Sequence, residues 1–239
     1  MACPKKRRTE ENERDLRMFV PKAIAIDLDG TLTDRRRAIN CRAVEALRRL
    51  KIPVILATGN TPCFARAVAK IIGVSDIVIC ENGGVVRFSY DGEDLVLGNK
   101  EKCIKALEEL KKYFTIELLD FEYRKSEVCM RRTFDIEKAR EILRNYGVKI
   151  LDSGFAYHIS DVNVSKGKAL EFIAKRIGVN VRDFAVIGDS DNDVEMFEVA
   201  GFKIAVANAS ERLKELADLI TPSSDGDGVI EALEFLGLI

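Results

Sequence analysis

Three short apolar runs in the first third of the chain alternate with segments of helical periodicity. Residues 23–26, 54–57 and 77–80 are hydrophobic at every position, which is typical of strands buried on both faces. Between them, residues 40–50 and 61–73 carry apolar side chains three and four positions apart, as amphipathic helices do. This alternation predicts an α/β fold with a doubly wound, Rossmann-like parallel sheet that is covered by helices on both sides.

The two predicted helices have clear end signals. Asn40 is a suitable N-cap for the first helix, and Thr61-Pro62 supplies an N-cap and a helix-start proline for the second, which Gly73 ends. We expect five apolar residues to form the buried face of the second helix: Phe64, Ala65, Val68, Ile71 and Ile72.

The rhythm changes between about residue 85 and residue 159. Two helical segments, 100–112 and 136–146, are each followed by two strand-like runs, which predicts a small α+β insert with its own sheet. The strand-like runs are residues 116–119, 128–131, 148–151 and 155–159. Alternation then returns with helix 166–177, strand 184–187, helix 192–200, strand 204–207, helix 211–217 and strand 219–220. We therefore expect a core domain formed by residues 18–84 and 160–239, with a cap domain formed by residues 85–159.

The first 17 residues are charged and lack apolar periodicity, so we expect a disordered tail. The basic stretch 5–8 is a candidate nucleic-acid patch, but acids at positions 10, 11, 13 and 15 largely neutralise it. The formal net charge of the whole chain is -1, which argues against a nucleic-acid partner. We expect a chain that starts at Met18 to keep full activity.

Composition narrows the class of protein. The chain has 239 residues, enough for a large core, and no apolar run of membrane-spanning length, so we expect no membrane partner. The six cysteines are scattered without a Cys-x-x-Cys pair, and the N-terminus lacks a signal-peptide pattern, which favours reduced thiols in the cytoplasm. The single histidine, His158, lies in a strand-like run and is expected to be structural.

Carboxylates follow two of the buried runs. Asp27 and Asp29 come directly after residues 23–26, and Asp189 and Asp193 follow the run 185–188. Because ligands of an open parallel sheet bind beyond the carboxyl ends of its strands, we expect these acids to share one site. Carboxylates brought together repel and raise one another's pKa unless a cation lies between them. Oxygen ligands with little sulfur or imidazole nearby favour Mg²⁺ as the cofactor.

Other residues at strand ends and helix starts are suited to binding a phosphoryl group. Thr58 and the amide of Gly59 follow the second strand and can donate hydrogen bonds. Lys166 opens a helix that Ser165 can cap, although a cation at a helix N-terminus opposes the helix dipole. That local conflict is resolved if an anion binds between the Lys166 ammonium and the N-terminus of the helix. Together with the acids, these residues predict phosphoryl-transfer chemistry.

In these motifs the chain resembles the haloacid dehalogenase superfamily. Asp-Leu-Asp-Gly-Thr at 27–31 matches the first motif of that family, Thr58 the second, Lys166 the third, and Gly-Asp-Ser-Asp-Asn-Asp at 188–193 the fourth. The match runs from Met18 to the C-terminus without a departure at the four motifs.

The resemblance implies a role for each matching residue. Asp27 would be the nucleophile that forms an aspartyl-phosphate, and Asp29 would be the general acid and base. Asp27, Asp189 and the backbone carbonyl of Asp29 would hold Mg²⁺, with Asp193 binding the metal directly or through water. Lys166 would bridge the phosphoryl group and the nucleophile.

The position of the insert, between the second and third motifs, resembles the Cof-like branch, as do Glu81-Asn82-Gly83-Gly84 and the run 218–222. In size and layout the chain most resembles archaeal phosphoglycolate phosphatases. This resemblance implies a cytoplasmic phosphoric monoester hydrolase whose partner is a small anionic phosphomonoester, with 2-phosphoglycolate as the expected substrate. It leaves open a homodimer.

Several alternatives stay open at the level of sequence. A sugar-phosphate phosphatase, a phosphomannomutase-like enzyme and a non-catalytic phosphate- or Mg²⁺-binding module would use the same scaffold. Asp225 and Asp227 resemble a second cation loop, although a solvated turn is favoured. Four side chains of the insert are candidates to bind a substrate carboxylate, but a charged sheet face explains them equally well: Tyr123, Arg124, Arg131 and Arg132.

Overall fold

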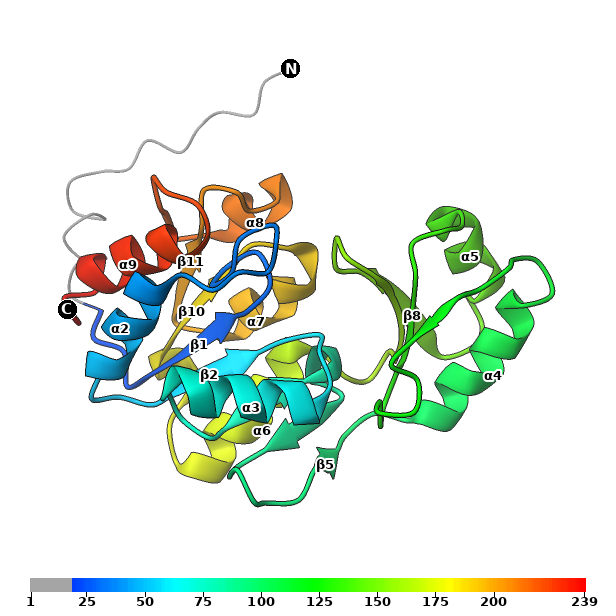
Figure 1. Cartoon of the computed structure of the whole chain (residues 1–239), viewed down its shortest axis with the longest axis horizontal. Helices are drawn as coiled ribbons and strands as arrows, with labels where there is room; N and C mark the ends of the chain where they lie inside the picture. Colours follow the sequence, from blue (N-terminus) through cyan, green and yellow to red (C-terminus); the bar gives the residue numbers. More distant parts are fainter. Residues whose placement is uncertain (1–18) are drawn as a thin grey trace.

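The computed structural model describes residues 19–239, so the predictions for the N-terminal tail lie outside the described residues. One sheet of eight strands forms the core, in the order β12-β11-β10-β1-β2-β3-β4-β5 (Figure 1). Its first six strands are parallel, and β4 and β5 extend one edge in antiparallel pairing. The strands are β1 (Ala23–Asp27), β2 (Val54–Ala57), β3 (Val78–Cys80), β4 (Val85–Arg87), β5 (Leu95–Val96), β10 (Phe184–Gly188), β11 (Phe202–Ala205) and β12 (Leu219–Ile220).

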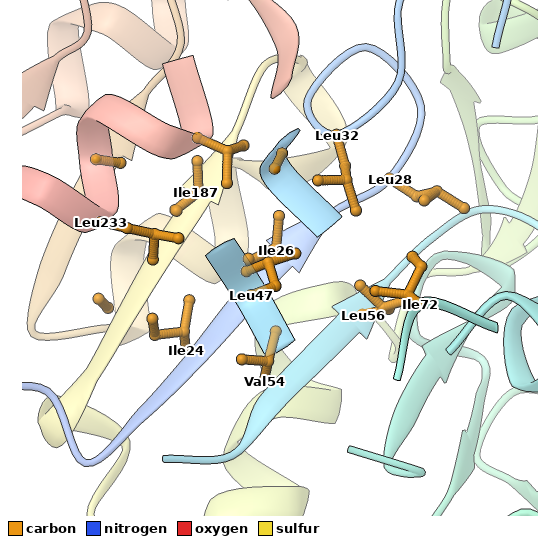
Figure 2. Close-up of a cluster of buried hydrophobic side chains, with 14 of the residues drawn as sticks. Ile24, Ile26, Leu28, Leu32, Leu47, Val54, Leu56, Ile72, Ile187 and Leu233 are labelled. Carbon is orange, nitrogen blue, oxygen red and sulfur yellow. The ribbon is translucent and has the colours of Figure 1, made fainter. Parts of the chain in front are cut away.

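Helices cover both faces of this sheet because its central strands are buried on both sides. One face packs on α2 (Cys41–Arg49), α3 (Pro62–Ile72) and α9 (Asp225–Phe235), and the other on α6 (Lys166–Ile177), α7 (Val194–Val199) and α8 (Glu211–Leu216). In Figure 2, Ile24 and Ile26 of β1 point into the first of these layers, towards Leu47 and Leu233. Ala23 and Ala25 alternate with them and face the second layer. The predicted doubly wound α/β core is confirmed.

The end signals act as expected, with one exception. The side chain of Asn40 accepts hydrogen bonds from the amides of Arg42 and Ala43 and so caps α2. Thr61 takes the N-cap position of α3, but its side chain makes no capping hydrogen bond. The expected buried face of α3 is partly wrong, since Phe64 and Ile71 are 44% and 74% exposed.

The last helix, α9, was not predicted from the sequence. Asp225 and Asp227 were expected in a solvated turn, yet they occupy the first turn of α9. Gly226 and Gly228 gave this segment the composition of a loop, and glycine has a low helix propensity. Tertiary packing overrides that propensity, because Val229 and Leu233 are fully buried against the core.

A separate antiparallel sheet of four strands lies beside the core sheet, in the order β6-β7-β9-β8. Its strands are β6 (Leu118–Leu119), β7 (Val128–Met130), β8 (Val148–Asp152) and β9 (Tyr157–Asp161), and its helices are α4 (Lys100–Leu110) and α5 (Ile136–Ile142). We call this sheet with its two helices the cap. The helices pack on the face of the sheet that points away from the core, so the opposite face is free to meet the core (Figure 1). The predicted α+β insert with its own sheet is confirmed.

The residues that follow the turn at 81–84 form two short strands. Strands β4 and β5 follow residue 84 but pair with the core sheet and not with the cap sheet. The division into domains at residues 84/85 and 159/160 stays a prediction. Among residues 19–239, no helix is long and apolar enough to cross a membrane.

Candidate active site

The two acidic segments meet because their strands are neighbours. β1 and β10 pair in parallel with Ile26 beside Ile187, so the last residue of β1, Asp27, and the residues after β10 lie at the same edge of the sheet. As a result, carboxylate oxygens of Asp27, Asp189 and Asp193 all lie within 4.8 Å of one another. The structure thus brings together three of the four acids that the sequence singled out.

The chain can approach Asp189 so closely only because residue 30 is a glycine. Gly30 has φ +93°, a left-handed conformation, and a Cβ atom there would lie 2.5 Å from Oδ2 of Asp189. The next residue, Thr31, donates a hydrogen bond of 2.9 Å from Oγ1 to Oδ1 of Asp189. The Asp-Gly-Thr turn therefore packs closely against the Asp189 carboxylate and orients it by a hydrogen bond, although Asp189 is far away in sequence.

Lys166 lies fully buried beneath the cluster. Its Nζ donates to Asp27, to Oδ1 of Asp193 at 2.7 Å and to Oδ1 of Asn192 at 3.4 Å. Burial alone would lower the pKa of Lys166, but the charges of Asp193 and Asp27 raise it overall, so the ammonium stays protonated. Ser165 caps the helix as expected, since its Oγ accepts from the amide of Lys168 at 3.1 Å.

One ammonium does not balance three carboxylates. Burial raises the pKa of Asp27 well above its ordinary value; the Lys166 charge lowers it, and Asp193 and Asp189 raise it further. Burial and the charge of Asp193 raise the pKa of Asp189 to about 7, despite the hydrogen bond from Thr31. A divalent cation would relieve this repulsion, and a set of carboxylate oxygens fits Mg²⁺. The residues present therefore fit the predicted metal.

Asp29 lies apart from the three clustered carboxylates. Its Oδ2 accepts a 2.6 Å hydrogen bond from Nδ2 of Asn60, and its Oδ1 is 3.7 Å from Nε of Arg37. Asp29 and Asp27 both line a cavity at the edge of the core sheet. Its acid/base role, and the metal bond from its backbone carbonyl, stay predictions.

Thr58 and Gly59 follow β2, the other neighbour of β1. Thr58 is buried, and its Oγ1 accepts from the backbone N and from Nδ2 of Asn60, both at 3.1 Å. Gly59 is among the residues that line the cavity, and Thr58 precedes it in the chain. The structure thus brings Gly59 to the cavity, with Thr58 supporting Asn60, which in turn binds Asp29.

The cavity lies between the core and the cap and has a volume of about 90 Å³. Its core side includes Asp27, Asp29 and Gly59, and its cap side includes Arg124 and His158. Pockets that hold drug-sized ligands measure roughly 300–1,000 Å³. This cavity therefore suits a substrate of only a few heavy atoms beyond a phosphoryl group.

A buried polar network that the sequence analysis did not foresee connects the acids to the cap. Nδ2 of Asn192 donates to Oδ1 of Asn82 at 3.2 Å, and Nδ2 of Asn82 donates to Oε2 of Glu127 at 3.0 Å. Oδ1 of Asn192 is also the third acceptor of Lys166. The sequence contains one indication of this network. Asn82 lies in the turn after β3, at the same edge of the sheet as the acids.

Glu81 fixes the same turn to the cap. Its carboxylate accepts from the backbone amides of Lys125 and Ser126 and from the Ser126 hydroxyl, at 2.6–3.1 Å. Glu81, Asn82 and Gly83 all have positive φ angles. Such a strained turn persists where the surrounding structure holds it, as this one does.

Comparisons with known proteins agree with this geometry. The family model described as haloacid dehalogenase-like hydrolase matches residues 24–146 and 131–233. A protein named phosphoglycolate phosphatase from Archaeoglobus fulgidus is 72% identical over 222 residues, covering 93% of this chain and 100% of the relative. A protein of the same name from Methanosarcina acetivorans is 48% identical, covering 90% of this chain and 96% of the relative.

Solved structures show the same architecture. The crystal structure of Thermoplasma acidophilum 0175 superposes with a TM-score of 0.85 at 28% identity, covering 92% of this chain and all of the other. A haloacid dehalogenase-like hydrolase from Bacteroides thetaiotaomicron shares the fold, with a TM-score of 0.74 at 22% identity over 90% of this chain and 98% of the other. By the family match and these relatives, the chain belongs to the haloacid dehalogenase-like hydrolases.

Proposed function

We propose that the chain is a Mg²⁺-dependent phosphatase that hydrolyses 2-phosphoglycolate to glycolate and phosphate. The observation that carries this proposal is the cluster of Asp27, Asp189 and Asp193 around Lys166, next to a small cavity between core and cap. The substrate is taken from the relative named phosphoglycolate phosphatase, which is 72% identical over its whole length.

The first half of the proposed reaction transfers the phosphoryl group to the protein. The Asp27 carboxylate attacks phosphorus, so that an O–P bond forms while the ester P–O bond to glycolate breaks. Asp29 donates a proton to the departing glycolate oxygen. Lys166, Thr58 and the amide of Gly59 supply positive charge and hydrogen-bond donors for the phosphoryl oxygens.

The second half regenerates the enzyme. A water molecule attacks the aspartyl-phosphate at phosphorus, Asp29 takes the proton of that water, and the bond between phosphorus and Asp27 breaks. Bound Mg²⁺, which Asp27, Asp189, Asp193 and the Asp29 carbonyl would hold, would supply positive charge against the phosphoryl oxygens. Closure of the cap over the cavity would exclude bulk water from the site.

The small volume of the cavity supports this proposal over its rivals. A space of about 90 Å³ favours a two-carbon ester over a hexose phosphate, the substrate of a sugar phosphatase or phosphomannomutase-like enzyme. Release of free phosphate, as opposed to isomerisation of a sugar phosphate, distinguishes a phosphatase from a mutase. A non-catalytic binding module would release none.

Phosphate release from 2-phosphoglycolate tests the proposal directly. We expect Asp27→Asn to lower kcat by roughly 10⁴-fold or more, because the nucleophile is lost. Asp91→Asn, the same change at an exposed loop residue, should leave kcat unchanged. EDTA should abolish the wild-type activity and Mg²⁺ restore it. Hydrolysis by Asp27→Asn at a near-normal rate would refute the proposed nucleophile.

We also propose that the protein acts in the cytoplasm. In the described part of the chain, Cys41, Cys63, Cys80, Cys103 and Cys129 are all free thiols, which suits a reducing compartment. The partner would be the small anionic phosphomonoester, and the homodimer stays a prediction.

A further inference from the structure

Three buried charged side chains gather on the cap side of the cavity. Arg124 is 4% exposed, Glu127 0% and His158 3%. Glu127 directly precedes β7, and the pairing of β7 with β9 places Cys129 opposite His158. Residues more than thirty positions apart are thereby brought into one group, which we call the cap triad.

The triad contains two cations on one carboxylate. Oε1 of Glu127 accepts from Nη1 of Arg124 and is 2.8 Å from Nδ1 of His158. Although burial alone would lower it, the Glu127 charge raises the pKa of His158 to about 9, so the imidazole is protonated at neutral pH. Glu81 is also a buried carboxylate, but it accepts hydrogen bonds from the amides of Lys125 and Ser126 and not from the triad. The triad therefore carries excess positive charge.

Arg124 also has an unused donor. Its Nη1 donates to the carbonyl of Gly59 at 2.9 Å, but its Nε is buried and has no hydrogen-bond partner. In the part of the chain that the structure describes, only three buried side-chain nitrogen or oxygen atoms are in this state. A buried N–H without an acceptor destabilises a fold, so packing alone does not account for an arginine at this position.

Arg124 and the proposed nucleophile line the same cavity. Arg124 and His158 line its cap side, and Asp27 lines its core side. Of the other charged groups that line it, Asp29 and Asp120 are acidic, whereas Arg37 forms an ion pair with Asp29. The triad is therefore the part of the cavity wall that attracts a second negative group.

We propose that Arg124, supported by His158, binds the carboxylate of the substrate and so selects phosphate esters of small hydroxy acids. This inference rests on the proposed phosphatase function and adds the residues that determine its specificity. A guanidinium offers paired N–H donors to a carboxylate, and the protonated imidazole adds positive charge beside it. Glu127 is a positioning residue that holds both cations in place.

Two esters that share the phosphoryl group and a two-carbon alcohol isolate the carboxylate: 2-phosphoglycolate and ethyl phosphate. The measured quantity is the ratio of their kcat/KM values. We expect Arg124→Gln to lower this ratio by about 10- to 100-fold, mainly through KM for 2-phosphoglycolate, as for a lost charge-assisted hydrogen bond. His158→Gln should lower it by about 3- to 10-fold. Arg131→Gln, an exposed arginine of the same cap paired with Glu117, should leave the ratio unchanged.

Each other outcome has a definite meaning. If Arg124→Gln slows both esters equally, Arg124 only ties the cap to Gly59 and the inference is overturned. If Arg124→Gln does not fold, by circular dichroism and Tm, the ratio for His158→Gln decides. If the wild type hydrolyses both esters without preference, the carboxylate site is wrong while the phosphatase stands. If the wild type hydrolyses neither, both proposals fail.

Discussion

The guanidinium carbon of Arg37 lies 4.4 Å from the ring centroid of Phe155, so a residue of the core touches the cap directly. Phe155 lies between β8 and β9 of the cap, and both residues line the cavity. Nε of Arg37 is also 3.7 Å from Oδ1 of Asp29. One side chain thus contacts both the cap and the carboxylate that we propose as the general acid and base.

This contact predicts that Phe155 stabilises the closed position of the cap. A cation–π contact contributes about 0.5–2 kcal/mol, so Phe155→Ala should lower kcat/KM for 2-phosphoglycolate by about 3- to 30-fold. Tm should change little, because Phe155 belongs to none of the three hydrophobic clusters of core and cap. Tyr113→Ala, which removes a 55% exposed ring that does not line the cavity, is the matched control and should leave kcat/KM unchanged. An equal effect of both substitutions would contradict the contact as its cause.

Gly83 is predicted to be essential for the position of Lys166. Its φ is +95°, and a Cβ atom there would overlap the carbonyl of Ser165 and lie 2.7 Å from the amide nitrogen of Lys166. Gly83→Ala should therefore combine overpacking with left-handed strain and destabilise the fold by about 2–4 kcal/mol. Steady-state assays should show lost activity as well.

Gly154 supplies the matched control for this substitution. Its φ is +78°, but no atom lies within 4 Å of the added Cβ. Gly154→Ala should cost only the strain, about 1 kcal/mol, so its Tm should stay several degrees above that of Gly83→Ala. Equal Tm values for the two variants would show that the close approach at Gly83 is unimportant.

The raised pKa of Asp189 predicts how Mg²⁺ stabilises the protein at different pH values. Without a divalent cation, burial and Asp193 raise that pKa from 3.8 to about 7. The native state then binds the proton more tightly than the unfolded state, so this contribution to stability is complete below pH 4 and lost as pH rises through 7. Mg²⁺ binds the deprotonated form, so the Tm gained on adding Mg²⁺ should be larger at pH 8 than at pH 5.5.

Thermal unfolding in EDTA and in excess Mg²⁺, at both pH values, measures this difference. Asp189→Asn removes one of the two clustered acids with a raised pKa, the other being Asp27, and should reduce the pH dependence of the Mg²⁺ effect. A wild-type gain in Tm that is the same at pH 5.5 and pH 8 would contradict the role of Asp189.

The raised pKa of His158 predicts that the protein loses stability at high pH. Burial would lower its pKa, but Glu127 raises it from 6.5 to about 9. The stabilisation is therefore complete below pH 6.5 and is lost as pH rises through 9, on the order of a few kcal/mol in total. Urea unfolding in excess Mg²⁺ between pH 7 and pH 10 should show this decline for the wild type and a flatter profile for His158→Gln. Parallel profiles would mean that His158 is not the titrating group.

The sequence alone was sufficient for the core sheet and for the acids at its edge. Runs that are apolar at every position form β1 and β10, and the polar residues after each strand leave the sheet on one side. The meeting of Asp27 with Asp189 follows from that local pattern together with the rules for parallel sheets. Asn40 and Ser165 were predictable as caps for the same reason, since capping depends on immediate neighbours in the chain.

Only the tertiary structure decided the features that depend on packing between distant segments. Helix α9 was missed because its glycines have low helix propensity and its burial against the core is not visible locally. The cap triad was also not predictable from the sequence. At that level a charged sheet face and a binding site explained Arg124 equally well. The pairing of β7 with β9 buries Arg124 and His158 on one carboxylate. Burial, which no local pattern of charges encodes, is what turns those side chains from a solvated surface into a candidate recognition site.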